Sequence, residues 1–145
     1  LEDGKAAKYI TDFPNANTIK MKNCISIPHL GASTEESEDN CAYMAAHELI
    51  DYLENGNIVN SVNFPNVEMP KASAVRICVF HQNVPAVLSK ISSVISSQNI
   101  NIANMINKSK GDFAYTMIDC DENITDETVS LLKNIEGVVR IRVIK

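Results

Sequence analysis

Strand-like and helix-like runs of hydrophobic positions alternate through the second half of the chain. In residues 75–80 and 138–144, apolar side chains occupy every second position, which is typical of strands with one buried face. Two further strand-like runs, residues 101–107 and 113–120, are joined by a short turn at Ser109-Lys110-Gly111. We therefore expect this half of the chain to contain one sheet.

Two helical runs separate these strands. Their apolar residues recur three and four positions apart: Val84, Val87, Leu88, Ile91, Val94 and Ile95 in the first run, and Thr128, Val129, Leu132 and Ile135 in the second. Asn83 and Thr125 are the expected N-caps, and Gly137 follows the second helix. Because strand–helix–strand connections are right-handed, the order β-α-β-β-α-β predicts a four-stranded antiparallel sheet with both helices on one face. This α+β arrangement is ferredoxin-like.

The first part of the chain predicts a less complete structure. Residues 6–13 and 24–27 are strand-like, and the turn-forming residues 14–17 lie between them. Two short strands are at best marginal as an independent unit. We therefore expect this segment to be a piece of a larger sheet.

A long helix is predicted over residues 34–55. Ser33 and Glu36 match a capping box at its start, and Gly56 stands where a left-handed C-terminal cap belongs. Its apolar stripe consists of Ala42, Ala45, Ala46, Leu49, Ile50 and Leu53. Residues 58–65 then form an extended run, and residues 66–71 have the prolines of a linker at either side.

Composition and charge narrow the class of protein. The chain has 45% hydrophobic and 21% charged residues, the balance of a soluble globular protein. Its formal net charge of -5 argues against a general nucleic-acid binder, which would show a basic stripe. No apolar stretch approaches the ~20 residues of a membrane span. The first residue is Leu1 and not Met, so we expect the sequence to begin inside a longer polypeptide.

The cysteines and histidines show no metal-binding pattern. Cys24, Cys41, Cys78 and Cys120 are far apart and form no CxxC pair. The three histidines lack metal-ligand spacing. An even number of cysteines leaves disulfides open, but reduced and partly buried thiols in a cytoplasmic protein are the better interpretation.

One histidine stands on a turn between a strand-like run and a helix start. The segment is Ile27-Pro28-His29-Leu30-Gly31-Ala32-Ser33-Thr34. Pro28 fixes its own φ and Gly31 permits conformations closed to other residues, so the turn can hold the imidazole at the rim of a sheet. A proton-transfer group is useful there. The alternative is a turn histidine with no chemistry.

A second histidine begins the pattern His81-Gln82-Asn83-Val84-Pro85, at a strand-to-helix turn. The helix N-terminus that follows offers free N–H groups to a carboxylate, and His81 and Asn83 can hydrogen-bond the polar groups of a small zwitterion. The alternative is that Asn83 only caps the helix and that His81 is a surface residue at a strand end.

The His29 segment closely resembles the segment that carries the general acid/base histidine of D-2-hydroxyacid dehydrogenases, and within that family of the D-3-phosphoglycerate dehydrogenases. The likeness runs from end to end, because Asn60-Ser61-Val62-Asn63-Phe64-Pro65 also resembles the stretch leading to their regulatory domain. The resemblance implies that residues 1–31 end a Rossmann-type nucleotide-binding domain. It implies a crossing helix, extended segment and linker over residues 32–71, and an ACT regulatory domain over residues 72–145.

The resemblance also implies a chemistry. In the family the histidine, here His29, exchanges a proton with the C2 oxygen during NAD-dependent oxidation of 3-phosphoglycerate. Asp12 matches, within one residue, an aspartate that contacts the nicotinamide carboxamide. The family's glutamate beside the histidine has no match, since Ala16-Asn17 occupy that region, so the carboxylate partner of His29 stays open. The dinucleotide loop and the substrate arginine are absent, and we expect this chain alone to be inactive and not to bind NAD.

The H-x-N-x-P turn resembles the serine site of the ACT domains in these enzymes, where two domains pair edge to edge. His81, Asn83 and Asn101 match the serine-contacting positions, so the resemblance implies an L-serine effector and a homodimer. Ala86 departs from the glycine that usually follows the proline.

Other interpretations stay open. One is an ACT-like binding module that responds to another amino acid or to none. Another is an RNA-recognition or metal-carrying domain of the same topology. Phe80, Phe113 and Tyr115 would suit RNA, but the acidic charge counts against it.

Overall fold

The computed structural model of the chain describes Leu1 and residues 3–145. It divides into two units, residues 1–45 and residues 46–145. The division falls inside helix α1 (Glu35–Asn55), so the last turns of this helix belong with the second unit.

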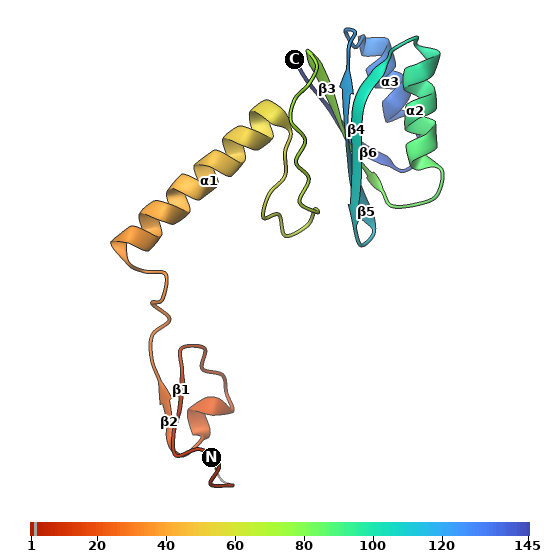
Figure 1. Cartoon of the computed structure of the whole chain (residues 1–145). Coiled ribbons are helices and arrows are strands. Elements are labelled where there is room, and N and C mark those ends of the chain that lie inside the picture. The colour runs from red at the N-terminus through yellow and green to blue at the C-terminus, as the bar shows by residue number, and fades with distance from the viewer. Residues whose placement is uncertain (2) are drawn as a thin grey trace. The chain divides into compact units, whose positions relative to one another are not determined.

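The second unit contains the expected four-stranded antiparallel sheet. Its elements are β3 (Val75–Gln82), α2 (Val87–Ser97), β4 (Ile102–Lys110), β5 (Phe113–Cys120), α3 (Asp126–Lys133) and β6 (Val138–Ile144). The strands lie in the order β4-β5-β3-β6 and all neighbours are antiparallel. Both helices cover the same face of the sheet (Figure 1). The prediction of a ferredoxin-like βαββαβ fold is confirmed.

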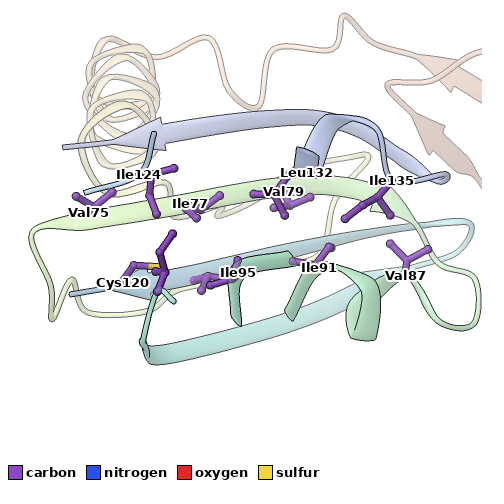
Figure 2. Close-up of a cluster of buried hydrophobic side chains, with 12 residues drawn as sticks. Val75, Ile77, Val79, Val87, Ile91, Ile95, Cys120, Ile124, Leu132 and Ile135 are labelled. Carbon is purple, nitrogen blue, oxygen red and sulfur yellow. The ribbon is translucent and has the colours of Figure 1, made fainter. Parts of the chain in front are cut away.

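The main hydrophobic core lies between this face and the two helices. Every second residue of β3, namely Val75, Ile77 and Val79, is buried there, together with Ile91 and Ile95 of α2. Figure 2 shows these side chains meeting within one cluster. Fully burying one such side chain is worth roughly 1.5–3 kcal/mol, so the alternation of β3 and the stripe of α2 hold the unit together.

The opposite face of the sheet is covered by the segment that precedes β3. Ile58 and Val67 are joined by a pair of backbone hydrogen bonds, and both are buried in a second cluster with Met69. The strands contribute Cys78, Phe80, Tyr115, Met117 and Ile144 to this cluster. The sheet is therefore packed on both faces.

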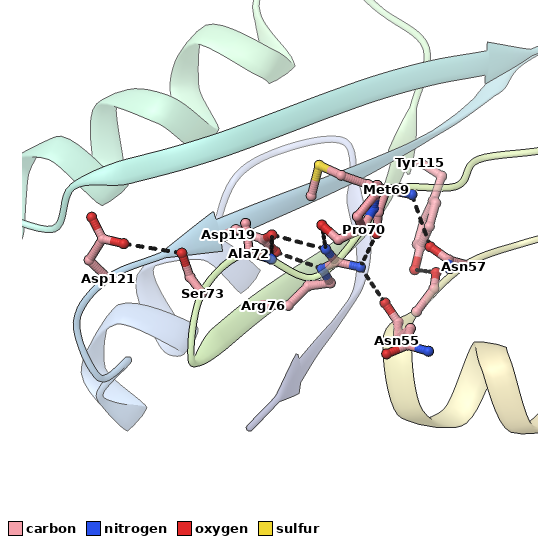
Figure 3. A network of polar contacts seen from close by, with 11 residues as sticks. Asn55, Asn57, Met69, Pro70, Ala72, Ser73, Arg76, Tyr115, Asp119 and Asp121 are labelled. Carbon is pink, nitrogen blue, oxygen red and sulfur yellow. Dashed lines mark hydrogen bonds and ion pairs between the residues drawn. The ribbon is translucent and has the colours of Figure 1, made fainter.

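An arginine near the start of the inner strand β3 fastens this segment and the end of α1 to the sheet (Figure 3). Arg76 and Asp119 are fully buried, and Arg76 Nε lies 2.6 Å from Asp119 Oδ1. The same guanidinium donates to the carbonyls of Asn55, Met69 and Pro70 at 2.7, 2.8 and 3.0 Å. The buried charge is paired and its donors are satisfied, which is the condition for tolerating it.

A second arginine caps the same helix end. Arg142 of β6 donates to the carbonyls of Tyr52 and Leu53, and its guanidinium lies 4.8 Å from the centre of the Tyr52 ring. Cations at a helix C-terminus satisfy orphan carbonyls and complement the helix dipole.

The ends of α1 differ partly from expectation. The Thr34 hydroxyl accepts a hydrogen bond from the Ser37 N–H at 3.2 Å, so the cap is Thr34, and the capping box predicted at Ser33 is wrong by one residue. Gly56 has φ +76°, which confirms the left-handed C-terminal cap. No residue of α1 is buried, so the predicted apolar stripe is exposed within the described residues.

The first unit contains a two-stranded parallel sheet. Strand β1 (Tyr9–Thr11) pairs with β2 (Cys24–Ser26), and the short 3₁₀ helix η1 (Thr18–Lys20) lies between them. Both strands are shorter than predicted. Of the described residues in this unit only Thr11 is buried. Parallel sheets are normally covered on both faces, so this pair has the character of an incomplete sheet.

The cysteines form no disulfide among the described residues. Cys41 is exposed, whereas Cys78 and Cys120 are buried. Burial raises the pKa of Cys78 and raises that of Cys120 to about 11. These two thiols are therefore protonated at neutral pH and act as small hydrophobic side chains. Separately, no helix in the described part of the chain is long and apolar enough to cross a membrane.

Candidate functional site

The first candidate group lies at one edge of the parallel strand pair. His29 Nδ1 is 2.8 Å from Asp12 Oδ2, and the two side chains are 55% and 45% exposed. Phe13 packs against the imidazole edge to face, with ring centroids 4.5 Å apart. Asp12 follows β1 directly and His29 follows β2, and the carboxyl ends of parallel strands meet at the same edge of a sheet.

This contact sets the proton positions of His29. A carboxylate only accepts hydrogen bonds, so Nδ1 carries a proton and donates it to Asp12. The other nitrogen, Nε2, is then the one that can exchange a proton with a substrate. The sequence left the carboxylate partner of His29 open. The pairing of the strands brings Asp12 to that position.

His81 lies in a different environment from the one the sequence suggested. Its side chain is only 3% exposed, so the interpretation as a surface residue is wrong. Nδ1 lies 2.8 Å from the Gln82 carbonyl, and Nε2 lies 2.8 Å from the hydroxyl of Thr116. That hydroxyl also lies 2.8 Å from Oδ1 of Asn107. Both ring nitrogens are therefore engaged within the chain.

Asn83 does not cap α2, which corrects the predicted N-cap. The helix begins at Val87, four residues later. The Asn83 N–H donates to the Asp112 carbonyl at 2.8 Å, and its amide group donates to the Gly111 carbonyl at 3.2 Å. Asn83 thus ties the end of β3 to the β4–β5 turn. Its side chain is exposed and accessible to a ligand.

Ala86 occupies the N-cap position of α2 in a left-handed conformation, with φ +69° and ψ -8°. Its carbonyl accepts from the Lys90 N–H at 3.0 Å. Glycine adopts this conformation without a steric penalty, whereas an alanine side chain meets the following carbonyl. The turn thus keeps a backbone shape suited to glycine.

Asn101 lies at the other end of the sheet from His81 and Asn83. Ile102 pairs with Cys120, whereas Gln82 pairs with Phe113, seven residues earlier on β5. At ~3.3 Å per residue this separation is roughly 20 Å. The Asn101 amide donates to Asp121 at 2.8 Å. A single chain therefore brings His81 and Asn83 together and leaves Asn101 apart.

A hollow of about 280 Å³ borders the same strand-to-helix turn. It is lined by Gln82, Val84, Pro85, Val87, Lys90, Glu136 and Gly137. The hollow joins the turn to the α3–β6 connection and offers one ammonium and one carboxylate. Elsewhere in the described residues no three metal-ligating side chains come together.

Sequence reasoning missed Thr116 and Asn107. Their only signal is their place on neighbouring strands, where Asn107 pairs with Thr116 across the β4–β5 hairpin. The hairpin was predicted, but the register that aligns the two residues was not.

The second unit is a ferredoxin-like βαββαβ domain, and it follows a long helix and an incomplete parallel sheet that carries a His–Asp pair. No protein-family model matches the sequence. The chain is 32% identical over 127 residues to D-3-phosphoglycerate dehydrogenase of Escherichia coli K12. The aligned region covers 86% of this chain and 31% of that protein. It is 39% identical over 106 residues to D-3-phosphoglycerate dehydrogenase 1 of Saccharomyces cerevisiae, covering 70% of this chain and 22% of the relative.

Among solved structures, the ACT domain from GTP pyrophosphokinase of Chlorobium tepidum is similar over 48% of this chain and 95% of that one, with 19% identity and a TM-score of 0.42. The chain is a homologue of the C-terminal part of the D-3-phosphoglycerate dehydrogenases. It spans about a third or less of the length of these curated relatives.

Proposed function

We propose that this chain is the C-terminal part of an NAD-dependent D-3-phosphoglycerate dehydrogenase, and that residues 72–145 are its amino-acid-binding regulatory domain. The observation that carries the proposal is the strand-to-helix turn at His81 and Asn83. It lies at the end of the sheet in a homologue of these enzymes, with an exposed amide on Asn83 and a hollow beside it. L-serine is the proposed effector, and the cytoplasm is the proposed location.

The dehydrogenase part of the proposal places His29 in proton transfer. Nε2 of His29 would take the proton from the C2 hydroxyl of 3-phosphoglycerate, or return it in the reverse direction. NAD, which this chain alone is not expected to bind, would supply the hydride acceptor or donor. Asp12 holds the imidazole in the tautomer that this requires, which the 2.8 Å contact supports. A contact of Asp12 with the nicotinamide stays a prediction. This chain lacks the rest of the site and is expected to be inactive alone.

The effector part of the proposal needs two copies of the chain. Strand β4 is at the edge of the sheet and most of its residues are exposed. Antiparallel pairing of β4 with β4 of a second copy would place Asn101 of the second copy beside the Lys110 end, where His81 and Asn83 lie. A homodimer paired along this edge would complete the three-residue site that one chain leaves divided.

A second candidate is an ACT-like module that binds another amino acid or none, and two observations favour it. Ala86 adds a methyl group where the turn suits glycine, and both nitrogens of His81 are already engaged. RNA recognition is less well supported, because Phe80 and Tyr115 are buried beneath residues 58–69 and cannot stack on bases.

The proposal is tested by adding a panel of amino acids to this chain. Calorimetric titration measures their binding, and thermal unfolding measures their effect on the melting temperature. We expect L-serine to bind and to raise the melting temperature by roughly 5 °C or more at 100 times its Kd, and D-serine to do neither. Asn83→Ala should abolish the shift. Asn63→Ala, an exposed asparagine outside the site, should keep it. Binding of a different amino acid, or of none at millimolar concentration, would favour the second candidate.

A further inference from the structure

The end of α1 and its cap are held by side chains from three strands of the sheet. The donors are Arg76 of β3, Tyr115 of β5 and Arg142 of β6, and the acceptors are the carbonyls of Tyr52, Leu53, Asn55 and Gly56. We call these three donors the helix socket. Figure 3 shows Arg76 and its bond to the Asn55 carbonyl. The last carbonyls of a helix lack partners within it, and in this structure the sheet supplies them.

Gly56 lets the backbone of the helix end lie directly against the sheet. It is buried, its φ is +76°, and a Cβ atom there would lie 2.6 Å from Cys78 Sγ and 3.1 Å from Ile144 Cδ1. The Tyr115 hydroxyl donates to the Gly56 carbonyl at 2.6 Å. Burial raises the pKa of Tyr115, so this hydroxyl stays protonated and remains a donor. The contact leaves no room for a side chain and fixes the helix end in position.

The segment between α1 and β3 is fixed as well. The side chain of Asn57, just after the helix cap, accepts from the Met69 N–H at 3.1 Å. The Ala72 N–H donates to Asp119 Oδ2 at 3.0 Å. The prolines around residues 66–71 predicted a linker, but these hydrogen bonds tie the stretch both to the helix end and to the sheet. It therefore lacks the freedom of a joint.

The first half of α1 has a different environment from the second. Residues 35–45 are exposed, apart from the half-buried Ser37. In the second half, the Glu48 carboxylate accepts from Asn60 at 2.6 Å, and the socket holds the last turn. The division of the chain after residue 45 coincides with this change.

We propose that the regulatory unit begins inside α1, close to Ala46, and that no joint separates α1 from β3. The inference rests on the proposed function for the regulatory role of the sheet, whereas the boundary itself needs no ligand. Any movement of this unit in the longer protein therefore carries the end of α1 with it. Because α1 is continuous from Glu35 to Asn55 and Glu35 closely follows His29 in the sequence, one helix connects the regulatory unit to the turn of the residue proposed for proton transfer.

The experiment measures amide hydrogen exchange of the whole chain, without ligand, residue by residue with NMR. The protection factor of each segment is divided by that of β3, so that changes in global stability cancel. In the wild type we expect residues 46–55 and Met69 to be protected within about tenfold of β3, and residues 36–45 to be protected roughly a hundredfold less. Protection of residues 46–55 or Met69 as low as that of residues 36–45 overturns the boundary. No effector is added, so failure of serine to bind leaves the boundary standing.

Gly56→Ala tests the socket, because the added methyl group meets Cys78. We expect it to lower the relative protection of residues 46–55 roughly tenfold or more. The control is Gly111→Ala, which places alanine at a similar φ of +61° with no neighbouring heavy atom within 4 Å of its Cβ, and which should leave that ratio unchanged.

Tyr115→Phe removes one socket donor and keeps the ring, so it should lower the same ratio about three- to tenfold. This variant decides the question if Gly56→Ala does not fold. Equal losses in Gly56→Ala and Gly111→Ala, or an unchanged ratio in Tyr115→Phe, overturn the socket and with it the absence of a joint.

Discussion

Ala86 is the residue at which the strand-to-helix turn between β3 and α2 carries backbone strain. Its φ of +69° costs an alanine roughly 1–2 kcal/mol, whereas glycine pays about 0.5–1 kcal/mol in chain entropy. We therefore expect Ala86→Gly to raise the free energy of unfolding by roughly 0.5–1 kcal/mol, measured by urea denaturation. Ala103 on strand β4 has no positive φ, so Ala103→Gly relieves no strain and should lower the free energy of unfolding by a similar amount. Equal effects of the two substitutions would show that the left-handed position is not strained.

The residues of the candidate site differ in how much of the fold must be known before they can be predicted. The motif around His81 and Asn83 is local, so the sequence identifies it without knowledge of the fold. The partners of His81 depend on the register of two strand pairs, in which His81 faces Ala114 and Asn107 faces Thr116. A shift of one residue in either pair would separate them, and a single sequence does not fix that register.

Local signals decide the ends of helices only where no neighbouring strand competes for them. Thr125 accepts from the Thr128 N–H at 3.2 Å, as predicted for the N-cap of α3. Asn83 has the same preference for an N-cap, but β3 extends to Gln82. The backbone N–H and the side-chain amide of Asn83 both donate to carbonyls of the β4–β5 turn. Tertiary hydrogen bonds thus override the capping preference and move the helix start to Val87.

The attachment of α1 to the sheet depends on the buried pair of Arg76 and Asp119. Removing one partner leaves an uncompensated charge, so Arg76→Met should lower the free energy of unfolding by about 3–5 kcal/mol. The double variant with Asp119→Leu should recover part of this loss, because no buried charge remains. Chemical denaturation measures all three proteins. Arg140→Met, an exposed arginine on β6, should change stability by less than about 0.5 kcal/mol, and a comparable loss there would contradict the argument.

The whole chain combines a unit with two packed faces and a unit with almost no interior. The sheet of residues 46–145 has a hydrophobic cluster on each face, whereas the described residues before Ala46 bury only Thr11. The complete sheet follows from the alternating patterns in β3 and β6, and the incomplete sheet follows from the short runs around β1 and β2. What the sequence pattern does not reveal is that residues 58–69 cover the second face, because their apolar residues show no regular period.

This difference predicts the pattern of amide hydrogen exchange along the chain. Opening of a segment costs free energy in proportion to the packed contacts it loses, so β3 and β5 should be protected close to the limit of global unfolding. The amides of β1 and β2 should exchange within seconds to minutes at neutral pH, since their side chains are mostly exposed. Mass spectrometry of exchanged peptides measures both regions in one sample. Protection of β1 equal to that of β3, persisting at tenfold lower protein concentration, would show that the first unit is stable by itself and would contradict the view that its sheet is incomplete.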